Sequence, residues 1–246
     1  MKTFRFDLSS AALHILAMAF MLCDHLWGTI IPGNQWLNNI GRLAFPIFAF
    51  LIVEGYMHTR NLRHYVCRLV LFALISEIPF NLMLSGRFFY PVHQNVLWTF
   101  LLGLGLIHLN ESARKKGNVL LTLFTAAATL ILGMLLGTLA MLDYYGAGVA
   151  TVLIFYFFRG RRWWCFPAQF AALYYLNAEI LGGLILELTI FGVSFSLLQQ
   201  SLAVLALIPI WLYRGRHGFH PKWFRWFNYL FYPVHMLLLW LISLFL

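Results

Sequence analysis

Apolar runs of about twenty residues recur along almost the whole chain, separated by short polar or basic loops. A helix of that length crosses the hydrocarbon core of a bilayer, because each residue adds about 1.5 Å. Only 10% of the residues are charged, against roughly 25% in soluble domains. Short alternating strands of the kind that build a membrane β-barrel are not evident. The pattern predicts an all-α, polytopic integral membrane bundle.

Nine membrane-spanning helices are expected, with ten as the alternative. They are placed at residues 10–31, 43–57, 65–84, 95–109, 119–136, 144–158, 163–176, 195–213 and 227–246. Residues 180–191 are predicted to form a re-entrant or interfacial segment; a second short crossing among residues 163–191 would give ten. Since no loop exceeds about 15 residues, residues 1–246 are expected to form one membrane-embedded domain without a soluble domain.

The positive charges indicate the orientation of the chain. If the N-terminus is cytoplasmic, 15 of the 17 Lys and Arg residues fall on the cytoplasmic side, and only Arg42 and Arg87 do not. This bias is typical of a multi-pass membrane protein. It explains the net charge of +9 without nucleic-acid binding. The three cysteines, Cys23, Cys67 and Cys165, are too scattered for a disulfide framework, and no metal site is expected.

Arg42 and Glu54 place two charges in one apolar stretch, residues 41–60. Twelve residues of helix separate them by roughly 18 Å, so they cannot pair with each other. A charge inside a membrane span costs about 2.5–3.5 kcal/mol and is usually functional. Each of the two is therefore expected to have a partner on another segment.

Several polar residues are predicted to lie at one depth, toward the non-cytoplasmic side, with a histidine slightly deeper. They are Asp24, His25, Arg42, Glu77, Asn95, Asp143 and His235. Each has a structural alternative; Arg42 could reach lipid headgroups, and Asp143 could cap a helix. Their convergence from several spans nevertheless favours a buried acid–base centre. Because adjacent helical residues point about 100° apart, Asp24 and His25 cannot share a face, and one of them is expected to work with another span.

A second polar group is expected at the cytoplasmic side, formed by Glu54, His58 and Arg60, with Arg63 nearby. Glu54 and His58, four residues apart, could be a simple structural pair. The basic loops, several of which carry Trp or Tyr, would suit a phosphate-bearing cofactor with a flat base. They would equally suit anionic lipid headgroups.

Motifs carrying these residues occur in order along nearly the whole chain. They are MLCDH (21–25), GRLAFPIFAFLIVEG (41–55), ISEIPFNL (75–82), QNVLWTFLLGL (94–104), DYYGAGV (143–149) and FYPVHM (231–236). Together they resemble the TraX family of conjugal-transfer membrane proteins, which is linked to N-terminal acetylation of pilin. Residues 160–225 contribute no matching motif.

The resemblance implies a bacterial cytoplasmic-membrane acetyltransferase that takes acetyl from acetyl-CoA and delivers it to an amine such as a protein N-terminus. A histidine near the end of the first span and an aromatic-x-x-His in a late span are also similar, more loosely, to membrane acyltransferases that modify surface glycans. The acceptor (protein, peptide, glycan or lipid) stays open. A small transporter or an assembly scaffold is the non-enzymatic alternative.

We hypothesise that His25 is the general base, oriented by Asp24 or Glu77, because histidine titrates near neutral pH. Arg42 would hold a buried carboxylate or stabilise the oxyanion. His235 would be a second base or bind the thioester.

Four further residues are given supporting roles: Glu77, Asn95 as a neutral donor, Asp143 and Glu54. At the cytoplasmic face, His58, Arg60 and Arg63 would hold the phosphates of coenzyme A.

Overall fold

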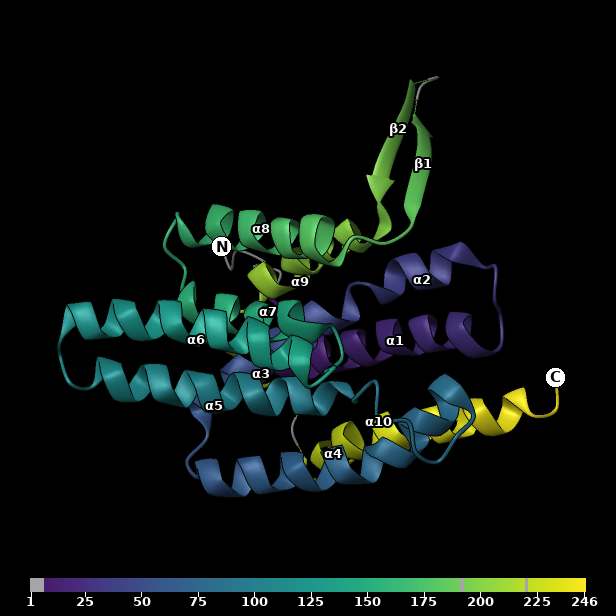
Figure 1. Ribbon diagram of the computed structural model, residues 1–246, viewed down its shortest axis with the longest axis horizontal. Coiled ribbons are helices and arrows are strands. Elements are labelled where there is room, and N and C mark those ends of the chain that lie inside the picture. The colour runs from purple at the N-terminus through teal and green to yellow at the C-terminus, as the bar shows by residue number, and fades with distance from the viewer. Residues whose placement is uncertain (1–6, 191–192, 220) are drawn as a thin grey trace, which may run out of the picture.

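The computed structural model describes residues 7–190, 193–219 and 221–246 and shows a helical bundle with one projecting hairpin (Figure 1). The α-helices are α1 (Ser10–Thr29), α2 (Gln35–Gly41), α3 (Ala44–His58), α4 (Leu62–Ser85), α5 (Val96–Arg114), α6 (Val119–Leu139), α7 (Tyr145–Phe157), α8 (Cys165–Tyr174), α9 (Leu207–Leu212) and α10 (Lys222–Ser243). The other elements are the π-helix η1 (Tyr175–Leu181), strands β1 (Ile185–Ile190) and β2 (Val193–Leu198), and the 3-10 helix η2 (Gln199–Ala206).

Six helical segments in the described part of the chain are long and apolar enough to cross a membrane. They are α1, α2 with α3, α4, α5, α6 and α10. The helix α2 forms within the connection predicted between the first two spans. Two further apolar helices, α7 and the combined η2–α9 segment, are shorter. The predicted helical, multi-pass character is confirmed, whereas the expected count of nine is not.

Polar side chains start the long helices at the ends of the apolar runs. The side chains of Ser9, Asn61, Asn95 and Asn118 each accept a hydrogen bond from a backbone N–H in the first turn of α1, α4, α5 and α6 respectively. Such caps satisfy amide groups that have no partner within the helix.

The short helix α7 lies at the centre of the bundle and packs against α3, α5 and α6. Ten of its thirteen residues are buried. Glycines bring it close to α6, because a Cβ atom at Gly146 would collide with the backbone of Met134. Small residues permit such close helix contacts in membrane proteins. The thirteen residues of α7 extend only about 20 Å, which is shorter than the hydrocarbon core of a bilayer. The surrounding helices therefore enclose it.

The region from residue 163 to residue 213 differs most from prediction. Instead of a span at 163–176, the short helix α8 continues into η1. Instead of a span at 195–213, the chain forms β2, η2 and α9. At 1.5 Å per residue, the ten residues of α8 cover only about 15 Å, and Gly182 and Gly183 adopt positive φ angles of 64° and 118° that end η1.

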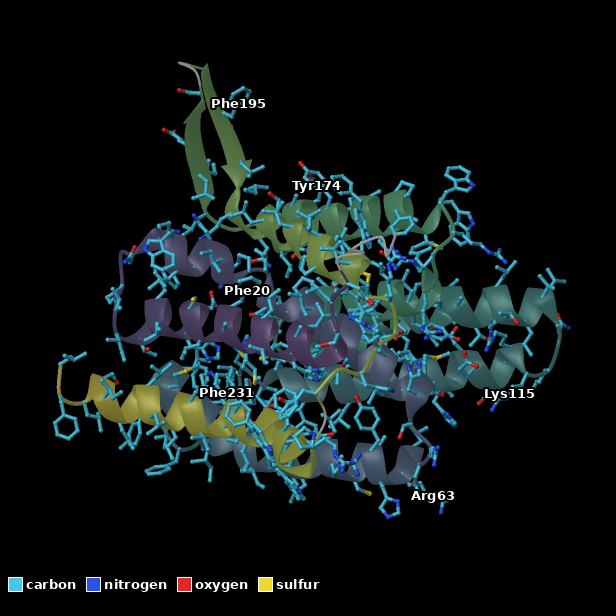
Figure 2. The ribbon with its side chains drawn as sticks, turned by 180° about the vertical axis from the view of Figure 1, so that it is seen from behind. Phe20, Arg63, Lys115, Tyr174, Phe195 and Phe231 are labelled. Atoms are coloured by element: carbon cyan, nitrogen blue, oxygen red, sulfur yellow. The ribbon has the colours of Figure 1, made fainter. Side chains whose placement is uncertain are left out.

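The first strand of an antiparallel hairpin, β1, occupies residues 185–190 of the segment 180–191 that was predicted to be re-entrant or interfacial, of which residue 191 lies outside the described residues. In its register Ile185 pairs with Leu198 and Glu187 with Ser196. The hairpin projects away from the helices, and the labelled Phe195 lies on it (Figures 1 and 2). Among the described residues, the named secondary structure is helical except for this pair of strands, which the sequence prediction of an all-α fold did not include.

Candidate functional site

Two neighbouring cavities lie among α1, α3, α5 and α10. The large cavity, of about 380 Å³, also borders α4. The small cavity, of about 40 Å³, reaches the turn before α7. The side chains that line both are Met21, Phe48, Val96, Phe100 and Tyr232. Because the same apolar and aromatic residues line both spaces, the two cavities adjoin each other.

The lining residues show which end of the bundle each cavity occupies. The large cavity is lined by Ser10, which begins α1, by His58, which ends α3, and by Arg225, in the first turn of α10. The small cavity is lined by His25, about 22 Å further along α1 from Ser10. The cavities therefore follow one another along the helix axes.

His25 and His235 form the polar pair beside the small cavity. The Nδ1 atom of His25 lies 2.7 Å from Nε2 of His235, and the two rings are nearly parallel, edge to edge, with centroids 4.9 Å apart. His25 lines the cavity, whereas His235 lies outside its lining and is only 5% exposed. The ring of Phe231 lies nearly parallel to that of His235, with the ring centroids 4.7 Å apart.

The hydrogen bonds determine the neutral tautomers of this pair. Nδ1 of His235 lies 2.6 Å from the carbonyl oxygen of Phe231, which can only accept, so this nitrogen carries the proton. Nε2 of His235 is then the acceptor, and Nδ1 of His25 donates to it. The Nε2 atom of His25 is left with its lone pair. This is the arrangement that a general base requires.

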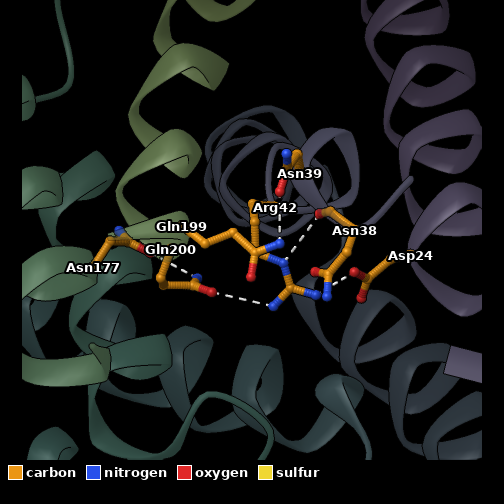
Figure 3. Close-up of polar contacts among 7 residues, drawn as sticks. All are labelled: Asp24, Asn38, Asn39, Arg42, Asn177, Gln199 and Gln200. Atoms are coloured by element: carbon orange, nitrogen blue, oxygen red, sulfur yellow. Dashed lines mark hydrogen bonds and ion pairs between the residues drawn. The ribbon is translucent and has the colours of Figure 1, made fainter. Parts of the chain in front are cut away.

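Asp24, which precedes His25 in the chain, forms an ion pair with Arg42. Figure 3 shows this ion pair and its polar neighbours. Arg42 also donates to Gln200 Oε1 at 3.1 Å, and Gln200 donates to Asn177 Oδ1 at 3.0 Å. The absence of a side chain at Gly41 makes room, because a Cβ atom there would overlap the carboxylate of Asp24. The network ties α1 and the end of α2 to η1 and η2.

This arrangement confirms two geometric predictions. Arg42 finds its partner on α1, and Glu54 finds Arg159, whose Nε donates to Glu54 Oε1 at 2.7 Å. Asp24 and His25 do work with different segments, since they bond to Arg42 and His235 respectively.

Glu77 and Asn95 bind to each other outside the lining of the small cavity. Asn95 donates to Glu77 and to the carbonyl oxygen of Ala73 while it caps α5, and Trp98 Nε1 donates to Glu77 at 3.1 Å. Neither Glu77 nor Asn95 lines either cavity. The carboxylates of Asp24 and Glu77 both have other partners, so His235 is the residue that orients His25.

Asp143 lines the small cavity and pairs with His93 from the connection between α4 and α5. Its carboxylate lies 3.3 Å from His93 Nε2. The hydrogen bond to Asp143 raises the pKa of His93 above its ordinary value. The following residue, Tyr144, has a φ of 60° and also lines the small cavity. Side chains in this backbone region are uncommon and cluster at functional sites.

The residues predicted at the cytoplasmic face separate into two groups. Glu54 and His58 line the large cavity, and His58 Nδ1 lies 3.7 Å from Glu54 Oε2. Arg60 and Arg63 are exposed and line neither cavity. Figure 2 shows Arg63 at the periphery, at the same end of the bundle as Lys115.

Other residues at the cavities were not singled out by sequence reasoning. Arg68 and Arg225 line the large cavity, and Asn228 and Tyr229 lie beside them. Arg68 was expected only as part of the cytoplasmic charge bias, whereas Arg225 belongs to one of the basic loops predicted to suit a phosphate-bearing cofactor or lipid headgroups. The sequence could place each arginine on the same helical face as nearby lining residues. It could not show which other helix that face would contact. Gln200 likewise lies in the region without a recognised motif.

Comparison with known proteins places this geometry in context. A family model described as TraX protein matches residues 9–243. A curated protein of Dichelobacter nodosus, described as probable fimbrial assembly protein FimC of serogroup H1, is 29% identical over 247 residues, with 95% of each chain covered. No solved structure matches the chain with significance.

Proposed function

Because the chain belongs to the TraX family, we propose that it is an integral membrane acyltransferase that transfers acetyl from acetyl-CoA to an amine. The observation that carries the proposal is the His25–His235 pair, whose hydrogen bonds leave a histidine lone pair beside a cavity. The N-terminus and the end of the large cavity that is lined by Ser10, His58 and Arg225 would face the cytoplasm, in agreement with the charge bias.

The proposed reaction begins when an uncharged amine attacks the thioester carbonyl carbon. The C–N bond forms as Nε2 of His25 takes the proton from the amine nitrogen, and Nδ1–H of His25 stays bonded to His235. Collapse of the tetrahedral intermediate breaks the C–S bond. His25 then returns the proton to the thiolate, so that the products are an N-acetyl amide and coenzyme A.

The remaining side chains at the small cavity would support this step. Tyr144 brings a hydroxyl to the same cavity as His25 and would donate to the oxyanion. The nitrogens of Arg42 bond to Asp24, Gln200 and the carbonyl oxygen of Asn38. Arg42 therefore acts as a positioning residue that holds the end of α2 against α1.

The acceptor that we propose is the N-terminal amine of a surface-fibre subunit. The related protein of Dichelobacter nodosus is described as a probable fimbrial assembly protein, and a protein amine suits the general base described above. Acetylation would remove the positive charge of that amine.

The experiment uses acetyl-CoA labelled in its acetyl group, supplied to membranes that contain the protein, its His25→Ala variant or neither. We expect one or more membrane proteins to be labelled only with the unaltered protein. Labelling that survives alkaline hydroxylamine identifies an amide, since this reagent cleaves both thioesters and oxygen esters.

The other functions give different results in the same experiment. Hydroxylamine-sensitive label on a glycan or lipid would identify an O-acyltransferase. Equal labelling with and without the protein, in membranes where its folding has been verified, would contradict acyl transfer. A transporter or scaffold would then be favoured.

A further inference from the structure

The large cavity has features that neither the family nor the His25–His235 pair accounts for. Its volume of about 380 Å³ lies within the usual range for small-molecule sites. One end is polar and basic, and the other end adjoins the small cavity. It therefore fits a long ligand with an anionic head at the basic end and its reacting group at the end that adjoins the small cavity.

Arg68 and Arg225 supply the positive charge at the basic end of the large cavity. Arg68 lies in the second turn of α4 and Arg225 in the first turn of α10, and both line the cavity. Neither forms a salt bridge with a carboxylate among the described residues. The acidic residue of the lining, Glu54, is paired with Arg159. The basic end of the cavity thus keeps an excess of positive charge, which suits phosphate groups.

Asn228 provides a second, independent feature, one turn deeper than Arg225 on α10. Its Oδ1 atom is buried and has no hydrogen-bond partner among the described residues. A buried polar atom left in this state destabilises the ligand-free protein. Asn228 lines the cavity, but this oxygen does not face the open space. After rotation of the side chain, a ligand with an amide N–H would satisfy it, whereas a hydrocarbon chain would not.

We propose that the large cavity binds the pantetheine arm of a coenzyme A thioester, with the phosphate groups at Arg68 and Arg225 and an amide of the arm at Asn228. The inference rests on the proposed function and replaces the sequence expectation that Arg60 and Arg63 hold the phosphates. From Arg225 to His235, α10 rises roughly 15 Å, a distance that the extended arm can cover.

The direct test is binding of unacylated coenzyme A to the full chain in detergent, measured by calorimetry without an acceptor. We expect saturable binding that weakens roughly ten- to a hundred-fold in Arg68→Ala and in Arg225→Ala, as for a lost charge-assisted hydrogen bond. Arg162→Ala removes an exposed cationic side chain that lines neither cavity and should bind normally. Arg63→Ala should also bind normally; a loss confined to Arg63→Ala would instead support the sequence expectation.

Fragments of the ligand divide the site into its two parts. Pantetheine, which lacks phosphates, should bind less tightly to Asn228→Leu than to the unaltered protein, by roughly five-fold or more. It should be insensitive to Arg68→Ala. Adenosine 3′,5′-bisphosphate should show the opposite pattern. Asn228→Leu should leave the melting temperature of the ligand-free protein unchanged or raised, because it removes an unsatisfied buried atom.

The outcomes separate this site from the proposed reaction. Binding that is sensitive to Arg68, Arg225 and Asn228 supports the site even if no acceptor is ever labelled, and His25→Ala should retain it. Binding that none of the three substitutions affects overturns the site and leaves acyl transfer standing. If coenzyme A does not bind but phosphatidylglycerol copurifies and is lost in Arg68→Ala, the cavity holds a lipid and the proposal is wrong.

Discussion

The two cavities differ in how completely their polar side chains are satisfied. At the small cavity, His25, Asp24 and Asp143 each bond to a side chain from a different segment. At the large cavity, Arg68 and Arg225 have no carboxylate partner and Asn228 Oδ1 accepts no hydrogen bond within the described chain. A site for chemistry is held rigid by its own contacts, whereas a binding site keeps polar groups for its ligand.

The comparison predicts that substitutions at the small cavity abolish turnover while the donor still binds. His25→Ala and His235→Ala should each reduce acetyl transfer roughly a hundred- to ten-thousand-fold, since each removes part of one general base. The double variant should be little worse than either single variant, because the two residues act as a unit. The measurement is the initial rate with labelled acetyl-CoA.

The control for this prediction is His108→Ala, which removes an exposed histidine that bonds to Tyr56 and lines neither cavity. It should retain its rate. If the effects of His25→Ala and His235→Ala simply multiply, the proposed pairing of the two residues is wrong.

Arg42→Gln tests the ion pair beside the histidines. The substitution leaves the carboxylate of Asp24 buried without its cation, and the free energy of unfolding should fall by about 3–5 kcal/mol. Adding Asp24→Asn should restore part of that loss. Thermal unfolding in detergent gives the comparison, and Arg87→Gln, at an exposed arginine of the connection after α4, is the control. Equal melting temperatures for the Arg42 and Arg87 variants would show that the pair contributes nothing to stability.

Gly146→Ala tests the packing of α7, which places Tyr144 at the small cavity. The added methyl group meets the backbone of Met134, and the free energy of unfolding should fall by about 1–3 kcal/mol. Gly105→Ala on α5 meets nothing within 4 Å and should be neutral or slightly stabilising. The melting temperatures of the two variants give the result, and a neutral Gly146→Ala would argue against a rigid α6–α7 contact.

The smallest expected effect concerns His93. Its pKa is raised in the folded chain by the hydrogen bond to Asp143, with a further contribution from Glu77. The stabilisation is therefore complete below the unfolded value of about 6.5 and is lost as pH rises through the folded value. The difference in melting temperature between the unaltered protein and His93→Gln should shrink as pH increases. A difference that does not change with pH would contradict the charged pair.

The sequence located much of the site but not its partners. The histidines and the need of Arg42 and Glu54 for distant partners could be recognised from charges inside apolar runs. Helical phase also required that Asp24 and His25 face different segments. It could not show that His235 would meet His25, because a contact between residues 210 positions apart depends on how α1 and α10 pack.

The sequence by itself determined a multi-pass helical membrane protein, because recurrent apolar runs and few charges leave helices as the stable solution in a bilayer. Only the tertiary structure decided the path between residues 163 and 213, where hairpin, π-helix and 3-10 helix replace predicted spans. Hydrophobicity reports burial rather than backbone geometry, and there the buried Gln200 satisfies its hydrogen bonds with Arg42 and Asn177 from other segments. The same packing decided which polar groups were left facing the large cavity.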